Sequence, residues 1–361
     1  MPVHTLPASE ALSQLDRFDA IIDARTEDEH ALDHVPGALN WPTLNNAERI
    51  TIGTMYKQVN AFEAKKRGAA LSARNIAAHI ERDVLDKPRD WKPLVYCWRG
   101  GNRSGALATI LGAIGFQVTL IEGGYKAWRA ALVESLPGLA ARLHYRVVCG
   151  PTGSGKTRLL QSLAAQGAQV LDLEALANHR SSVLGHIPGV PQPSQKRFDS
   201  LIWDALRHFD PTRPVYVESE SKKVGNVRVP DALIDAMRAS PCIDLQLSDE
   251  ERVALLLEDY DFFVQDSAHF CQRLQALTEL RGKAVVEDWI TQVQTGQTPA
   301  VVLDLLKLHY DPTYAQSISR NFSQYGQALP CVLRDRSPAA LNEAAASLIA
   351  GEAAAPASQA G

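Results

Sequence analysis

The sequence predicts an α/β protein with parallel sheets, divided into two domains. Short apolar runs alternate with segments of helical periodicity, a pattern typical of parallel sheets. Two of these runs lead directly into glycine-rich loops, at 97–104 and 150–157. The 361 residues suffice for two or three domains at roughly 100–200 residues each.

The composition is that of a globular protein, with 45% hydrophobic and 22% charged residues. The formal net charge of -4 excludes a chain that is basic throughout, so a polyanion would have to meet a local patch. Five scattered cysteines without a C-x-x-C pair argue against a zinc ribbon or a disulfide framework. No signal-peptide pattern and no apolar run of about 18 residues occur, so we expect a cytoplasmic protein that spans no membrane.

The elements of the first domain follow from apolar runs and periodicity. Three runs predict buried strands, at 20–24, 94–97 and 117–121. Isoleucine and valine at spacings of four predict a helix over 61–83. Asp23 and Cys97 end two of the strands, and Arg25 follows the first. Because parallel sheets bind ligands beyond the carboxyl ends of their strands, we expect Asp23, Arg25 and Cys97 near a site.

Cys97 stands where a strand meets a glycine-rich loop and then a helix over 104–111. Backbone N–H groups and the positive end of the helix dipole favour the thiolate, which is the nucleophilic form of cysteine. Converging N–H groups and arginines could also hold an anion of phosphate size. The residues of this predicted anion loop are Arg99, Gly100, Gly101, Asn102, Arg103 and Ser104. A buried structural cysteine is the alternative interpretation.

The second domain begins with an apolar strand at 145–149 that runs into the pattern G-x-x-x-x-G-K-T. A helix over 157–165 follows, so the pattern is a P-loop in its strand–loop–helix setting. Glycines let N–H groups point at a diphosphate, a lysine adds charge, and a threonine can ligate Mg²⁺. The predicted diphosphate-binding residues are Gly150, Gly153, Ser154, Gly155, Lys156 and Thr157, with Thr157 as the candidate magnesium ligand.

Further strands at 170–173 and 215–218 place polar residues beside the P-loop. The predicted supporting residues are Asp172, His179, Arg180, Glu218 and Glu220. Two glutamates stand where nucleotide triphosphatases usually place an aspartate, and no base-reading motif or water-positioning glutamine is evident. The loop could therefore grip a diphosphate without hydrolysing a nucleotide. In the alternative interpretations, Glu218 only pairs with Lys156, and His179 and Arg180 are ordinary core or surface residues.

The remaining chain is predicted to be mostly helical. Helices are expected within 249–281, 285–293 and 300–308, a linker at 137–143 and a turn at 310–314. The aromatic residues Tyr260, Phe262 and Phe263 are expected in a helical core. The Ala-rich segment 337–361 is expected to be a helix that frays into a disordered tail. The predicted domains are therefore 1–138 and 139–336, followed by the tail.

The first domain resembles the rhodanese family over about residues 10–135. The matching motifs are DAR at 23–25, HVPGALN at 34–40, YC and RSGA around the anion loop, and GGY-x-AW at 123–128. The resemblance implies that Cys97 carries a chalcogen as a persulfide-type intermediate. One departure is the spacing C-x5-R, which is one residue longer than in the common sulfur-transferring loop and resembles the loop of cysteine-dependent phosphatases. Another is an insertion between Trp41 and Arg74.

The pairing of both domains resembles the tRNA 2-selenouridine synthase family. The matching segments are 97–106, 150–157, 172–182 and 215–221. The resemblance implies replacement of sulfur by selenium at the wobble 2-thiouridine of tRNA. It further implies selenophosphate as selenium donor and geranyl diphosphate as the reagent that first alkylates the sulfur. Two rivals remain open: a nucleotide-regulated sulfurtransferase of the rhodanese type, and a cysteine-dependent phosphatase.

The resemblance assigns a partner to each of the two loops. Cys97 would accept selenium, and the P-loop would hold the diphosphate with Mg²⁺; no bound organic cofactor and a monomer are expected. The tRNA expectation comes mainly from the resemblance. Basic residues that could contact tRNA, or simply form solvated helix faces, are Lys57, Lys65, Lys66, Arg67, Arg74, Lys222, Lys223 and Arg228.

Overall fold

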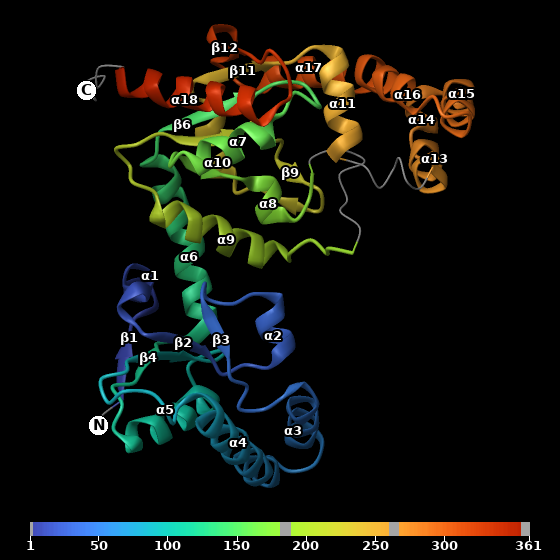
Figure 1. Ribbon diagram of the computed structural model, residues 1–361. Helices are drawn as coiled ribbons and strands as arrows, with labels where there is room; N and C mark the ends of the chain where they lie inside the picture. The colour runs from blue at the N-terminus through green and yellow to red at the C-terminus, as the bar shows by residue number, and fades with distance from the viewer. Residues whose placement is uncertain (1–2, 181–188, 260–266, 355–361) are drawn as a thin grey trace. The chain divides into compact units, whose positions relative to one another are not determined.

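The computed structural model describes residues 3–180, 189–259 and 267–354 (Figure 1). The chain divides into two compact units, here called unit 1 and unit 2. Unit 1 comprises Met1–Gly138 and Pro193–Asp204, and unit 2 comprises Leu139–Gln192 and Ala205–Gly361. Each unit is built around its own parallel sheet, which confirms the predicted fold class. Among the described residues, no helix combines the length and the apolar character that crossing a membrane requires.

The described part of unit 1 contains a five-stranded sheet of order β1-β5-β4-β2-β3, in which all neighbours are parallel. Its strands are β1 (His4–Leu6), β2 (Ala20–Asp23), β3 (Ala38–Asn40), β4 (Pro93–Tyr96) and β5 (Thr119–Ile121). Asp23 pairs in register with Tyr96, so Asp23 and Cys97 leave neighbouring strands at the same edge of the sheet. Chain direction and strand order together bring the two predicted positions to one edge.

Helices connect these strands and build the core of unit 1. They are α1 (Ala8–Gln14), η1 (Leu15–Arg17), α2 (Glu27–Leu32), α3 (Asn46–Gln58), α4 (Ala61–Asp83), α5 (Asn102–Ile114) and most of α6 (Gly124–Ala141). Ile22 and Val95 of the sheet lie in one apolar cluster with Ile76 of α4 and Leu107 of α5. The predicted helix over 61–83 is confirmed as α4.

The linker predicted at 137–143 is wrong, because α6 continues through Pro137 to Ala141. A proline inside a helix removes one hydrogen bond and costs roughly 3 kcal/mol. Packing holds the helix together here: Leu136 and Ala140 are buried, and the Tyr145 hydroxyl donates to the Ala140 carbonyl over 3.2 Å. The proline alone indicates a break in the helix, but the buried contacts around it keep α6 continuous.

Residues 193–204 were assigned to the second domain by the sequence, whereas the structure places them in unit 1. They form the start of α9 (Gln195–His208), which buries Phe198 and Trp203. The Trp203 indole N–H donates to Ser135 Oγ over 3.0 Å, and Ser200 Oγ lies 3.1 Å from Asp33 Oδ2. The apolar face of this helix therefore has its partners in the first part of the chain.

Unit 2 has a second parallel sheet in its described part, of order β12-β11-β6-β8-β7. Its strands are β6 (Tyr145–Cys149), β7 (Gln169–Leu171), β8 (Val215–Glu218), β11 (Cys242–Gln246) and β12 (Leu329–Val332). A short antiparallel pair, β9 (Lys223–Val224) and β10 (Val227–Arg228), accompanies it. Because β8 lies directly beside β6, residues that follow β8 come close to the P-loop that follows β6.

The described helices of unit 2 are α7 (Lys156–Ala165), α8 (Leu173–Ala177), the end of α9, α10 (Asp231–Arg238), α11 (Asp249–Asp259), α13 (Ser267–Gln275), α14 (Thr278–Arg281), α15 (Lys283–Gln294), α16 (Thr298–Leu305), η2 (Leu306–Tyr310), α17 (Asp311–Asn321), η3 (Tyr325–Gln327) and α18 (Pro338–Ala354). The helices predicted within 249–281, 285–293 and 300–308 are confirmed in the described residues. The expectation for Tyr260, Phe262 and Phe263 falls outside those residues.

Two expectations for the C-terminal third are corrected. Residues 310–314 were expected to be a turn, but helical structure runs through them from η2 into α17. Residues 337–361 were expected to be a helix that frays into a disordered tail. The helix is confirmed as α18, but it belongs to the core, because its leucines pack with those of α7. Leu341 and Leu348 of α18 share that cluster with Leu159 and Leu163. Residues 355–361 lie outside the described part.

Candidate functional site

The thiol of Cys97 lies between the end of β4 and the first turn of α5, with Gly101 at the start of that helix. The Ser104 hydroxyl donates to Cys97 Sγ over 3.1 Å. Burial by itself raises the pKa of the thiol. Hydrogen bonds from the Ser104 hydroxyl and from the N–H groups of Ser104 and Gly101, together with the charge of Arg103, outweigh burial and leave this pKa below its usual value. The surroundings therefore favour the thiolate.

Cys97 is 3% exposed, whereas Gly100 and Asn102 of the loop above it are exposed. The start of α6 fixes this loop: the Tyr125 N–H donates to the Cys97 carbonyl over 2.8 Å. Gly124 has a φ of +60°, and a Cβ there would lie 2.5 Å from the Gly100 nitrogen and closer still to the Cys97 carbonyl oxygen. The glycine pair before Tyr125 is thus required by the close approach of two backbones.

The two arginines of the loop have different environments. Arg103 forms an ion pair with Glu29 at 2.6 Å, and Glu29 is itself held by a capping box with Thr26 at the start of α2. Arg99 is exposed, and no acidic side chain in the described ranges lies within ion-pair distance of it. An incoming anion would therefore meet Arg99 as an uncompensated charge and Arg103 as a compensated one.

Asp23 and Arg25 form a buried ion pair at 2.6 Å behind the loop. Burial by itself raises the pKa of Asp23. Hydrogen bonds from His30 and Arg25 outweigh burial and leave this pKa below its usual value, so the carboxylate stays ionised. The Arg25 guanidinium also lies 4.0 Å from the centre of the Tyr125 ring. These two supporting residues thus act on the site through Tyr125, whose N–H holds the Cys97 carbonyl.

The P-loop joins β6 to α7 in unit 2. Gly150, Gly153 and Gly155 all have positive φ, and a Cβ at Gly150 would lie 2.5 Å from Ser154 Oγ. The Lys156 ammonium donates to the carbonyl of Gly150 over 2.8 Å. The alternative that Lys156 pairs with Glu218 is wrong for this structure, since among the residues it describes no such ion pair is formed.

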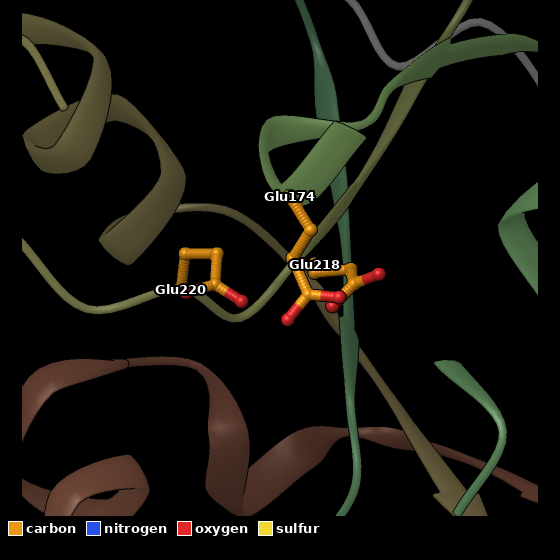
Figure 2. Close-up of side chains that lie close together, drawn as sticks. All are labelled: Glu174, Glu218 and Glu220. Carbon is orange, nitrogen blue, oxygen red and sulfur yellow. The ribbon is translucent and has the colours of Figure 1, made fainter. Parts of the chain in front are cut away.

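Three carboxylates converge beside the P-loop (Figure 2): Glu174 of α8, Glu218 at the end of β8, and Glu220. One oxygen from each lies within 4.8 Å of the others. Glu218 is 1% exposed and its Oε1 has no hydrogen-bond partner. Burial, reinforced by the charges of Glu174 and Glu220, raises the pKa of Glu218 well above its usual value. The Thr157 hydroxyl joins the cluster by donating to Glu174 Oε2 over 3.2 Å.

The cluster fits a divalent cation. Carboxylate oxygens, one of them buried without a partner, and a P-loop hydroxyl are the ligands that Mg²⁺ prefers. Glu174 was not predicted from the sequence; the nearby Asp172 was. The structure shows Asp172 capping α8 instead, by accepting a hydrogen bond from the Ala175 N–H over 2.8 Å. Only the position of Glu174, two residues into a helix that follows a strand, could have indicated it.

A pocket of about 370 Å³ opens in front of the P-loop in unit 2. Gly153, Gly155, Lys156 and Thr157 line one side. Four apolar residues from α11, α17 and the residue after α17 contribute to the lining: Leu255, Leu256, Ile318 and Phe322. The pocket therefore combines a cradle for phosphate groups with an apolar wall.

Tyr314 of α17 also lines this pocket and was missed by the sequence analysis. Its hydroxyl oxygen accepts a hydrogen bond from the Gly150 N–H over 2.5 Å, and its ring centre lies 5.9 Å from the Lys156 ammonium. Of the other predicted residues, Arg180 lines the pocket and donates to the carbonyl of Asp259. His179 packs against the turn at Gly225 and is not among the described lining residues.

A parallel α/β unit with a loop cysteine, joined to a P-loop unit, defines a rhodanese-like domain fused to a P-loop domain. The family of rhodanese-like domains matches residues 7–131, and the AAA domain of tRNA 2-selenouridine synthases matches residues 143–281. The chain is similar to tRNA 2-selenouridine synthases from several bacteria. The chain belongs to the tRNA 2-selenouridine synthase family.

The relative from Nitrosomonas europaea is 36% identical over 247 residues, which cover 66% of this chain and 63% of that protein. The relative from Alcanivorax borkumensis is 35% identical over 267 residues, 72% of each chain. The relative from a Sulfurovum species is 30% identical over 334 residues, 84% of this chain and 90% of that protein. The first match thus spans less than two thirds of its relative, whereas the Sulfurovum match spans most of both chains.

Proposed function

We propose that this protein is a selenium-transferring, tRNA-modifying enzyme that converts the wobble 2-thiouridine of tRNA into 2-selenouridine. Family membership and the names of its relatives support this reaction. The reaction proceeds in two stages: geranyl diphosphate alkylates the thiocarbonyl sulfur, and selenium from selenophosphate then replaces the S-geranyl group. Alkylation is useful because geranyl thiolate is a better leaving group than sulfide.

The pocket in front of the P-loop is the observation that carries the first stage. The thiocarbonyl sulfur bonds to C1 of the geranyl group as the bond from C1 to the diphosphate oxygen breaks. Loop N–H groups and Lys156 stabilise the charge on the departing diphosphate. The chain of the substrate is purely hydrocarbon, and each buried CH₂ contributes roughly 0.8 kcal/mol. Leu256, Ile318 and Phe322 offer it an apolar wall within the same pocket.

The acidic cluster would hold Mg²⁺ through Thr157, Glu174, Glu218 and Glu220. A bound Mg²⁺ offsets negative charge on a diphosphate leaving group. Without a cation, the three carboxylates repel each other and the incoming diphosphate, in keeping with the raised pKa of Glu218. Binding the cation and binding the diphosphate are therefore expected to favour one another.

The Cys97 loop is the proposed site of the second stage. Loop N–H groups and the exposed Arg99 bind the phosphate portion of selenophosphate. The Cys97 thiolate attacks its phosphorus, so that an S–P bond forms as the P–Se bond breaks and selenide is released. The lowered pKa of the Cys97 thiol matters because only the thiolate attacks the phosphorus as a nucleophile. Selenide then attacks C2 of the alkylated uridine, so that a C2–Se bond forms as the C2–S bond breaks and geranyl thiolate leaves. Water hydrolyses the S–P bond to phosphate and restores the Cys97 thiolate.

Mass analysis of tRNA nucleosides tests both stages. Purified protein is incubated with thiolated tRNA and geranyl diphosphate, with and without selenophosphate. We expect Cys97→Ser to abolish selenation and to leave S-geranyl-uridine as the product, and Lys156→Ala to abolish geranylation. Cys331→Ser and Lys283→Ala, which alter a cysteine and an exposed lysine outside both sites, serve as controls. Normal selenation by Cys97→Ser, or normal geranylation by Lys156→Ala, would contradict the assignment.

A further inference from the structure

The insertion in unit 1 forms a helical hairpin of α3 and α4, which pack side by side (Figure 1). Its base is fixed by Glu48 of α3, which pairs with Arg74 at 2.9 Å and accepts a hydrogen bond from Asn75 over 2.7 Å. Further out, Ile52 contacts α4 at Gly68, where the lack of a side chain lets the helices approach. The hairpin is thus a defined element of unit 1.

The outer part of the hairpin, residues 49–73, exposes large apolar side chains. Exposed fractions are 69% for Ile50, 54% for Tyr56, 74% for Val59 and 66% for Phe62. α3 lies wholly within the described residues, and none of its 13 residues is buried. Single exposed apolar residues are ordinary, but Tyr56, Val59 and Phe62 fall within seven positions around the connection from α3 to α4. Such a concentration of exposed apolar residues is typical of interaction surfaces. Folding of unit 1 does not explain them.

The same part of the hairpin is strongly basic. Residues 49–73 contain five basic residues and one acidic residue, in a chain whose formal net charge is -4. Lys57, Lys65 and Arg67 are exposed, and within the part of the chain that the structure describes no carboxylate lies within ion-pair distance of them. Lys66 pairs with Glu63 at 2.6 Å and lies 5.1 Å from the centre of the Phe62 ring. The positive charge here is therefore mostly uncompensated.

We propose that the outer part of the α3–α4 hairpin binds the tRNA substrate, with Lys57, Lys65 and Arg67 on phosphates and Tyr56 and Phe62 against unstacked bases. Positive charge matches the polyanion, and exposed aromatic rings provide the stacking surfaces that single-stranded RNA loops use. The inference rests on the proposed function, because it takes tRNA as the partner.

Two variants of the full-length protein separate the two contributions. In the first, Lys57→Ala, Lys65→Ala and Arg67→Ala are combined. Losing three phosphate contacts is expected to weaken tRNA binding at least about tenfold at low salt and to reduce the slope of log affinity against log salt by about 2. In the second, Tyr56→Ala and Phe62→Ala are combined. Losing both stacking rings is expected to weaken binding about thirtyfold or more without changing that slope.

A matched control removes the same charge elsewhere in unit 1: Lys87→Ala, Arg89→Ala and Lys92→Ala, all at exposed positions. The control should bind tRNA nearly as the wild type does. Because every altered residue is exposed, all variants should keep the wild-type melting temperature. They should also keep the wild-type rate of Cys97 alkylation, which would show that the site in unit 1 is intact. In the tRNA modification assay the hairpin variants should raise KM and leave kcat unchanged.

Three results would overturn the inference. Wild-type tRNA affinity in both hairpin variants would refute the hairpin alone and leave the proposed function standing. Polyglutamate competing as well as tRNA, with no effect of Tyr56→Ala and Phe62→Ala, would indicate a general anion or acidic-protein surface. No tRNA binding by the wild-type protein would remove both the inference and the proposed function.

Discussion

Removing the hydroxyl of Ser104 tests whether a single hydrogen bond sets the reactivity of Cys97. The hydroxyl is buried and lies 3.1 Å from the sulfur. A hydrogen bond to a charged group contributes roughly 1.5–3 kcal/mol, and about 1.4 kcal/mol corresponds to a factor of ten. At a pH below the pKa, Ser104→Ala should therefore reduce the thiolate fraction about tenfold or more. A more basic thiolate is intrinsically more reactive by about threefold per tenfold in acidity, so the net alkylation rate should fall about threefold.

The assay is the rate of Cys97 alkylation by iodoacetamide as a function of pH, followed by mass spectrometry of the peptide that contains Cys97. The midpoint of the profile should move to higher pH in Ser104→Ala, and the plateau rate should rise. Thr109→Ala, which removes an exposed hydroxyl from the same helix, should leave the profile unchanged. Equal midpoints in Ser104→Ala and the wild type would show that the backbone N–H groups and Arg103 suffice, which would refute this reasoning.

Two further predictions concern unit 1. Gly124→Ala should lower the free energy of unfolding by about 2 kcal/mol or more, because its φ is +60° and the new methyl group would overlap the Cys97 loop. Gly138→Ala should not destabilise the protein, because nothing lies within 4 Å of the added methyl group. Urea denaturation compares the two variants, and equal stability would contradict the described contact. Burial lowers the pKa of His34 to about 4, so on acidification the imidazole takes up a proton in the unfolded chain before it does in the folded one. The free energy of unfolding should therefore fall as the pH drops from 6.5 towards 4. His34→Asn should lose less stability over this range, and identical losses would show that His34 is not responsible.

The local chemistry of both sites could be predicted from the sequence because each depends on neighbours in the chain. A strand, a glycine-rich loop and a helix start place Cys97 next to Ser104, and the same order places Lys156 at the start of α7. Backbone N–H groups at a helix start point at the preceding loop whatever the rest of the fold does. The rhodanese-like and P-loop identities follow from the same local patterns.

The walls of the P-loop pocket could not be predicted in this way. Tyr314 reaches Gly150 across 164 positions of sequence, and its segment was expected to be a turn. Glu174 and Glu218 meet only because α8 and the end of β8 both lie next to the P-loop. No periodicity within a short window contains such information, because the contacts depend on strand order and on helices that follow much later.

Helix ends and unit boundaries show the same division. When read alone, the proline at position 137 indicates a break, and the alanines after position 337 indicate a helix that frays. Buried contacts of Ala140 and Leu341 instead hold α6 and α18 in helical form. The start of α9 joins unit 1 because Trp203 finds its partners there.

The sequence by itself thus determined the fold class, the two reactive loops and the family. Only the tertiary structure decided which distant side chains complete the P-loop site: the acids beside Thr157 and the apolar wall of the pocket. The physical reason is range. Hydrogen bonding and dipoles at a helix start act over a few residues, whereas burial of apolar and charged groups is settled by packing between segments far apart in the chain.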